Sequence, residues 1–143
     1  MRANVSAKFF YQNMSKINEL FFSLDLPYEW IMDFDSATKL YSFYSIDKNA
    51  LGALQLTVFS SNEHHWYPQD WLKEFNDAMI KEVSDYQSVY FIEKKSENNS
   101  IIYHWIIGFD SRMIHITYTV VLNSSYENEF EIVNKIVNTL IIK

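Results

Sequence analysis

The chain has 143 residues and no cysteine, and its 18 acidic residues outnumber its 12 basic ones, for a formal net charge of −6. The lack of cysteine excludes disulfides, thiolate metal sites and cysteine nucleophiles. The charge argues against nucleic acid as a partner, because that binding needs Lys and Arg to neutralise phosphates. No apolar run approaches a secretory signal core or the ~18 residues of a membrane span. We therefore expect one soluble, cytoplasmic domain over residues 1–143 that does not bind a membrane.

The N-terminal quarter is expected to be mainly extended. Residues 1–20 form either an N-terminal extension or a first strand, and over Asn4–Asn18 we favour extended structure over a short helical turn. Phe21–Leu26 alternates between faces and predicts a strand. Pro27 ends this strand, and the bend that follows places Trp30 against the domain.

Two neighbouring strands are expected next. Asp33–Thr38 reads as a polar loop, and Leu40–Ile46 as a strand. Asp47–Ala50 then makes a hairpin connection into a second alternating segment, Gly52–Phe59. Gly52, at the entrance of this strand, indicates a backbone conformation or a close approach that a side chain would block.

A covering helix is predicted over Pro68–Ser84. Proline suits the first helical position, and Asp70 lies in the first turn, where the helix dipole favours an acid. Apolar residues recur at helical spacing from Trp71 to Val83. Tyr86–Glu93 follows as a strand.

The stretch Ile101–Leu122 predicts two long strands joined by a tight turn at Asp110-Ser111. In that register Trp105 faces Ile116 and Tyr103 faces Tyr118, so the apolar faces of the two strands coincide. A shift of one residue would scramble both faces, and burial therefore specifies the pairing.

The chain closes with a second predicted helix, Ser125–Ile142. Ser124 and Glu127 match the spacing of a capping box, and an apolar stripe runs from Phe130 to Leu140. The expected fold class is α+β, a central antiparallel sheet of about six strands covered by the two helices.

Three residues of the hairpin, His104, His115 and Thr117, are candidate ligand or interaction residues. His104 opposes Thr117 and His115 opposes Ile106, which places both rings on one sheet face. No Asp or Glu within the hairpin arms lies there to orient an imidazole, and a structural role is the simpler interpretation.

The segment Glu63-His64-His65 has a metal-like composition. However, adjacent histidines on an extended chain point to opposite sides, and the helical spacing of a zinc motif is missing. A solvated loop is the preferred interpretation of His64 and His65. We therefore predict no metal, no cofactor and no catalytic residue.

The segment Phe21–Trp30, the strand Gly52–Val58 and the stretch from Trp105 to Tyr118 before a C-terminal helix are similar to PsbP-like domains. The resemblance covers Phe21–Lys143 as a pattern and is closest to small stand-alone bacterial members. It implies an antiparallel sheet with helices on its faces, and a binding or adaptor role. It carries over no functional residue.

The absence of catalytic motifs predicts a non-catalytic binding protein rather than an enzyme. Its expected partner is another protein, because the chain is acidic and 17% of it is aromatic. An immunity-type inhibitor of a basic toxin fits this charge. The alternatives are a small-ligand binder or hydrolase with a pocket near His104 and His115, and self-association through an aromatic sheet face.

Overall fold

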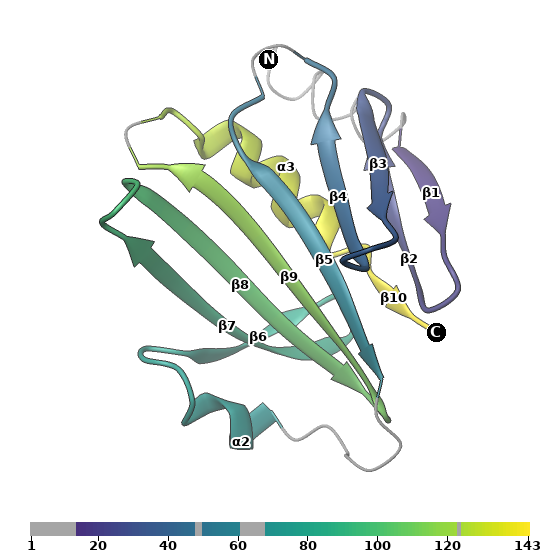
Figure 1. Ribbon diagram of the computed structural model, residues 1–143. Helices are drawn as coiled ribbons and strands as arrows, with labels where there is room; N and C mark the ends of the chain where they lie inside the picture. The colour runs from purple at the N-terminus through teal and green to yellow at the C-terminus, as the bar shows by residue number, and fades with distance from the viewer. Residues whose placement is uncertain (1–13, 48–49, 61–67, 123) are drawn as a thin grey trace, which may run out of the picture.

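The computed structural model describes residues 14–47, 50–60, 68–122 and 124–143, which form ten strands and two helices (Figure 1). The strands are β1 (Met14–Asn18), β2 (Phe22–Pro27), β3 (Trp30–Asp35), β4 (Leu40–Ser45), β5 (Ala53–Ser60), β6 (Met79–Val83), β7 (Tyr86–Lys95), β8 (Ser100–Phe109), β9 (Arg112–Val121) and β10 (Ile141–Ile142). The helices are α2 (Pro68–Leu72) and α3 (Glu127–Val137). A seven-stranded antiparallel sheet has the order β3-β4-β5-β9-β8-β7-β6, and a three-stranded sheet has the order β1-β2-β10.

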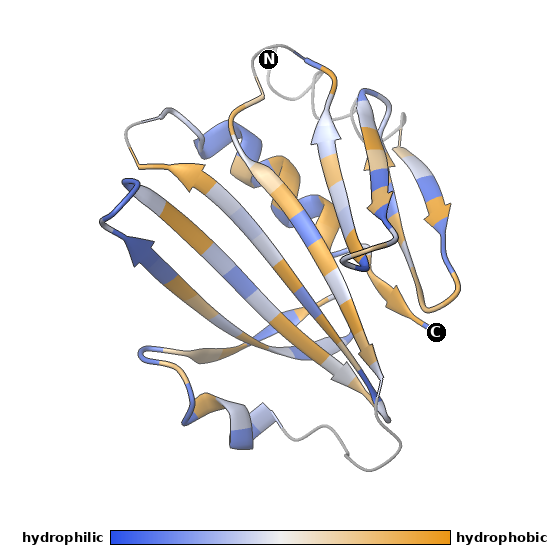
Figure 2. Ribbon diagram, in the orientation of Figure 1, coloured by the Kyte–Doolittle hydropathy of each residue, from blue (hydrophilic) through white to orange (hydrophobic). Residues whose placement is uncertain are grey.

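The β8–β9 hairpin lies at the centre of the large sheet, with the register that the sequence predicts. Trp105 pairs with Ile116 and Tyr103 with Tyr118. Asp110, in the turn, has a φ of 57°, a left-handed conformation that aspartate tolerates better than most residues. Hydrophobic and polar residues alternate along both strands in Figure 2, which explains why one face of the sheet is closed.

The main core lies on the face of the sheet that carries Trp105 and Tyr118, both 0% exposed. Helix α3 packs there through Phe130, whose ring stacks on Tyr118 with 5.8 Å between centroids. The three-stranded sheet packs on the same side, since Phe22 of β2 belongs to the same buried cluster. We call this the packed face.

A smaller apolar cluster lies on the opposite face, at the β6–β8 end of the large sheet. It comprises Val89, Phe91 and Ile106, against which residues of α2 and the segment after it pack. The Phe75 ring stacks on Phe91 at 4.1 Å between centroids.

The α+β prediction is confirmed, but its estimate of about six strands was too low for the seven-stranded sheet. Strand β3 begins at Trp30 and includes Asp33–Asp35, which the sequence analysis assigned to a loop. Only a four-residue connection separates this strand from β4. The strand predictions for β2, β4, β5 and β7 are confirmed, and β1 shows that Met14–Asn18 is extended.

The predicted helix Pro68–Ser84 is wrong beyond its first turns. It begins at Pro68 but ends at Leu72, and Met79–Val83 is the edge strand β6. Ile80 faces the smaller cluster, whereas Val83 faces the main core, so this stretch alternates at a period of two. Asp77, with a φ of 57°, lies between the two elements.

The C-terminal helix is also shorter than Ser125–Ile142. It ends at Val137, and Ile141–Ile142 pairs with β2 as a strand. The predicted capping box does not form, because the hydroxyl of Ser124 donates to the Val121 carbonyl at 2.7 Å and the N-cap residue is Tyr126.

Gly52 makes the close approach expected of it. A Cβ at this position would lie 2.5 Å from Cγ1 of Val120 and 2.6 Å from Cε1 of Tyr118. The Glu129 carboxylate of α3 accepts hydrogen bonds from the Gly52 N–H at 2.7 Å and from the Tyr118 hydroxyl at 2.6 Å. This contact fixes α3 to the start of β5.

Candidate functional site

The surface of the large sheet opposite Trp105 carries the candidate histidines, and we call its part from β3 to β7 the open face. By register it comprises Ile31, Asp33, Asp35, Leu40, Ser42, Tyr44, Ala53, Gln55, Thr57, Phe59, Met113, His115, Thr117, Thr119, Val121, Ile102, His104, Glu93 and Lys95. Its large apolar side chains stay accessible: Ile31 is 42%, Tyr44 40%, Phe59 47% and Val121 50% exposed. Helix α2 packs on β6 and β7, at one end of the sheet.

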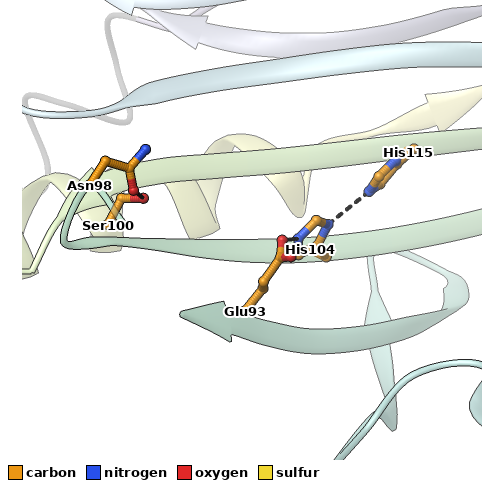
Figure 3. Close-up of polar contacts among 5 residues, drawn as sticks. All are labelled: Glu93, Asn98, Ser100, His104 and His115. Carbon is orange, nitrogen blue, oxygen red and sulfur yellow. Dashed lines mark hydrogen bonds and ion pairs between the residues drawn. The ribbon is translucent and has the colours of Figure 1, made fainter. Parts of the chain in front are cut away.

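The open face holds a row of three hydrogen-bonded side chains, Glu93, His104 and His115. They come from the adjacent strands β7, β8 and β9, and Figure 3 shows them in one line across the sheet. Nε2 of His104 lies 3.0 Å from Oε1 of Glu93, and Nδ1 of His104 lies 3.0 Å from Nε2 of His115. We call these residues the histidine row.

The sequence predicts the pairing of the two histidines correctly, but its local pattern gives no sign of Glu93. His104 opposes Thr117 and His115 opposes Ile106, as predicted, and the rings are in direct contact. The missing carboxylate comes from β7, outside the hairpin arms. It would have been found by pairing the predicted strand Tyr86–Glu93 with the first arm of the hairpin.

Aromatic packing holds the row in place. The His104 ring stacks on Phe91 at 4.3 Å between centroids, with 8° between the planes. Phe91 in turn stacks on Phe75, and Trp71 extends the series. The His104 side chain is 12% exposed, whereas the Glu93 side chain at the outer end of the row is 44% exposed.

Burial keeps both rings neutral at neutral pH. It lowers the pKa of His104, an effect that the Glu93 carboxylate partly opposes by favouring the charged ring. Burial also lowers the pKa of His115 to about 4, and the neighbouring His104 adds to this effect. Two neutral imidazoles can hydrogen-bond to each other without charge repulsion.

Uncharged polar side chains lie on one side of His115, away from the apolar Ile106 and Met113. Thr57 of β5 lies directly opposite it, and Thr117 is the next residue of β9 on the same face. Beyond Thr57, the amide of Gln55 donates to the Ser42 hydroxyl at 3.4 Å. The middle of the open face therefore carries hydroxyl, amide and imidazole groups.

Among the other candidates, Thr117 lies beside His115 on β9. His64 and His65 lie outside the described residues. Over the part of the chain that the structure describes, no group of three or more His, Asp or Glu residues is arranged to hold a metal ion.

Two cavities are present, and the second borders the row through Phe91. One of about 480 Å³ lies near Gly52 and Val120, and one of about 530 Å³ lies near Met79 and Tyr90. Neither is lined by His104 or His115.

Comparisons with known proteins place this geometry in a fold class. No family model and no curated protein matches the sequence. Among solved structures, the chain is similar to a crystal structure from Bacteroides thetaiotaomicron VPI-5482, with a TM-score of 0.73 and 20% identity over 92% of this chain and 49% of the other. This chain therefore spans about half the length of the Bacteroides protein.

Two further structures are similar over almost their whole length. LpqN of Mycobacterium tuberculosis, which is involved in cell envelope biogenesis, has a TM-score of 0.59 and 11% identity, with 96% of each chain covered. CyanoP, the cyanobacterial PsbP of Synechocystis sp. PCC 6803, has a TM-score of 0.61 and 7% identity over 92% of this chain and 93% of the other. The chain has the PsbP-like fold, as the sequence resemblance indicated. Among its described helices, none has the length and hydrophobicity to cross a membrane.

Proposed function

We propose that this chain is a non-catalytic binding protein and that the open face is its contact surface for another protein. The observation that carries the proposal is the difference between the two faces of one sheet. On the packed face, α3 and the small sheet bury the side chains around Trp105 and Tyr118, although Phe34, Ile92 and Phe109 on that side are more than 40% exposed. The open face leaves four large apolar side chains 40–50% exposed, on β3, β4, β5 and β9. Apolar and aromatic side chains with polar groups between them are typical of protein interfaces.

Charge favours a basic partner. The open face carries the carboxylates of Asp33, Asp35 and Glu93 and one ammonium, that of Lys95. Asp33 and Asp35 are exposed on the edge strand β3, and the whole chain has a net charge of −6. A positively charged surface would be attracted to this face and oriented on it. An inhibitor of the immunity type that neutralises a basic toxin in the cytoplasm is one protein of this description.

Site-specific photo-crosslinking in the source cells tests the proposal. The photoreactive residue p-benzoylphenylalanine replaces Phe59 on the open face and, as a matched aromatic control, replaces Tyr28, which is 79% exposed in the turn between β2 and β3. We expect a discrete adduct with a basic protein from position 59 and none from position 28. The adduct should disappear when Asp33 and Asp35 are both changed to lysine. No adduct from position 59, or equal adducts from both positions, would contradict the proposal.

A second copy of the chain is an alternative occupant of the open face. It would produce an adduct of twice the chain mass from position 59, and a dimer in light scattering. That outcome would replace the proposed heterologous partner with self-association.

The histidine row favours a second candidate function, binding or hydrolysis of a small ligand near His104 and His115. A hydrogen-bonded carboxylate and imidazole are also the elements of acid–base sites. NMR titration with a small-molecule fragment set distinguishes this function from protein binding. Shifts that concentrate at His115 and are lost in His115→Phe would support it, and shifts elsewhere would contradict it.

A further inference from the structure

The histidine row has a defined hydrogen-bond direction, because the group at its outer end cannot donate. An ionised carboxylate only accepts hydrogen bonds, so Nε2 of His104 carries the proton in its 3.0 Å contact with Glu93. In a neutral imidazole the other nitrogen is then an acceptor. Nδ1 of His104 therefore accepts from the Nε2–H of His115 at 3.0 Å. The last nitrogen of the row, Nδ1 of His115, is left without a proton.

This last nitrogen is available to a ligand. Within the described ranges, no residue forms a hydrogen bond with Nδ1 of His115, although Thr57 and Thr117 lie beside the ring. The ring is partly accessible rather than enclosed. An acceptor nitrogen at the surface of a contact face selects for groups that donate and selects against carbonyls and carboxylates.

We infer that His115 Nδ1 is the hydrogen-bond acceptor through which the open face recognises an N–H donor of its partner, and that Glu93, acting through His104, holds it in the acceptor state. The inference rests on the proposed function and specifies the chemistry of the partner, a basic side chain with N–H groups. The same group would be attracted by the acidic edge strand at Asp33 and Asp35.

Uptake of one proton by the histidine row would reverse the direction of the hydrogen bond between its two rings. With both nitrogens of His104 protonated, Nδ1 of His104 donates to Nε2 of His115, and Nδ1 of His115 must then carry a proton. The acceptor becomes a donor, which repels an N–H group.

Among the described residues, the charged groups that act on the row are Glu93 and Lys95 of β7, which act on His104, and His104 itself, which acts on His115. The neighbours on β5 are the uncharged Gln55 and Thr57, and the segment after α2 contacts the row through the Phe75–Phe91 stack. Because burial lowers the pKa of both rings, the acceptor form is the one present at neutral pH.

Long-range proton–nitrogen NMR of the imidazoles reads the tautomers directly. At neutral pH we expect both rings in one tautomer, with Nε2 protonated and Nδ1 bare. Glu93→Gln should give a mixture, because an amide can donate to His104 as well as accept from it. Glu82→Gln is the matched control, since it removes an equal charge from the same side of the sheet without contacting the row. A proton on Nδ1 of His115 in the unmodified chain would overturn the inference.

The crosslink from position 59 separates this inference from the proposed function. We expect Glu93→Gln to lower the adduct yield in proportion to the fraction of chains that leave the acceptor tautomer, about twofold for an even mixture, and Glu82→Gln to leave it unchanged. Lowering the pH toward 4 should reduce the yield in the unmodified chain more than in Glu93→Gln. Equal yields in the two variants would overturn the inference and leave the proposed function intact. No adduct in the unmodified chain would contradict the proposed function itself.

Discussion

The two faces of the seven-stranded sheet are built from the same strands, yet the side chains at the centre of each face differ in burial and polarity. On β8, Trp105 is completely buried against α3, while the preceding residue, His104, faces the other way and joins the histidine row. On β9, Ile116 lies on the packed face and Thr117 lies on the open face. Buried and open positions alternate along one hairpin, so substitutions one position apart should have different consequences.

The largest expected effect is on the packed face. Trp105→Ala should lower the free energy of unfolding by about 3–5 kcal/mol, because it removes a fully buried indole and leaves a cavity. Denaturant unfolding measures this loss. Thr117→Ala, on the open face of the neighbouring strand, serves as the control and should cost less than about 1 kcal/mol. Similar losses for the two variants would remove the distinction between the faces.

A smaller loss of unfolding free energy is expected at Gly52, immediately before β5. Gly52→Ala should destabilise the chain by about 1–3 kcal/mol, since the new methyl would overlap the Val120 and Tyr118 side chains and force them to move. Leu51→Ala, at an adjacent side chain that is 43% exposed, should have little effect in the same thermal or denaturant measurement. If Gly52→Ala left the free energy of unfolding unchanged, the Val120 and Tyr118 side chains would not pack tightly against Gly52 in solution.

The pH dependence of stability tests the burial of the histidine row. The pKa of His115 is about 4 in the folded chain and 6.5 for an ordinary histidine, so the unfolded chain binds more protons between these values. The contribution of His115 to the free energy of unfolding should therefore be fully present above about pH 6.5 and decrease as the pH drops toward 4. The part due to this ring is at most about 2 kcal/mol, because the ring is partly accessible to solvent.

The variant His115→Gln isolates this contribution. Denaturant unfolding at pH 7.5 and at pH 4.5 should show a smaller decrease for the variant than for the unmodified chain. An equal decrease would mean that His115 titrates as an exposed histidine.

The smallest effect on stability is expected at the edge of the open face. Changing Asp33 and Asp35 together to lysine should alter the free energy of unfolding by less than about 0.5 kcal/mol, because both side chains are exposed. The same change should abolish partner capture. If circular dichroism showed that this variant does not fold, the two aspartates would be required for folding rather than for binding.

The sequence was sufficient for the central hairpin, because the alternation on either side of Asp110 permits one register that buries Trp105 and Tyr118 together. It was insufficient for Met79–Val83. There, apolar residues at spacings of three and four also fit a helix, and pairing with β7 decided the outcome. Glu93 shows the same limitation at the site. Its contact with His104 depends on which strands are neighbours and in what register, and local periodicity carries no such information.

The central claim is that the packed face maintains the fold and the open face binds a partner. The most direct measurement is the pair of photo-crosslinking reactions, one from position 59 on the open face and one from position 28 in the turn between β2 and β3. The account predicts a basic protein attached at position 59 alone, with the attachment lost in the Asp33→Lys, Asp35→Lys variant. Capture from position 28 with none from position 59 would contradict it.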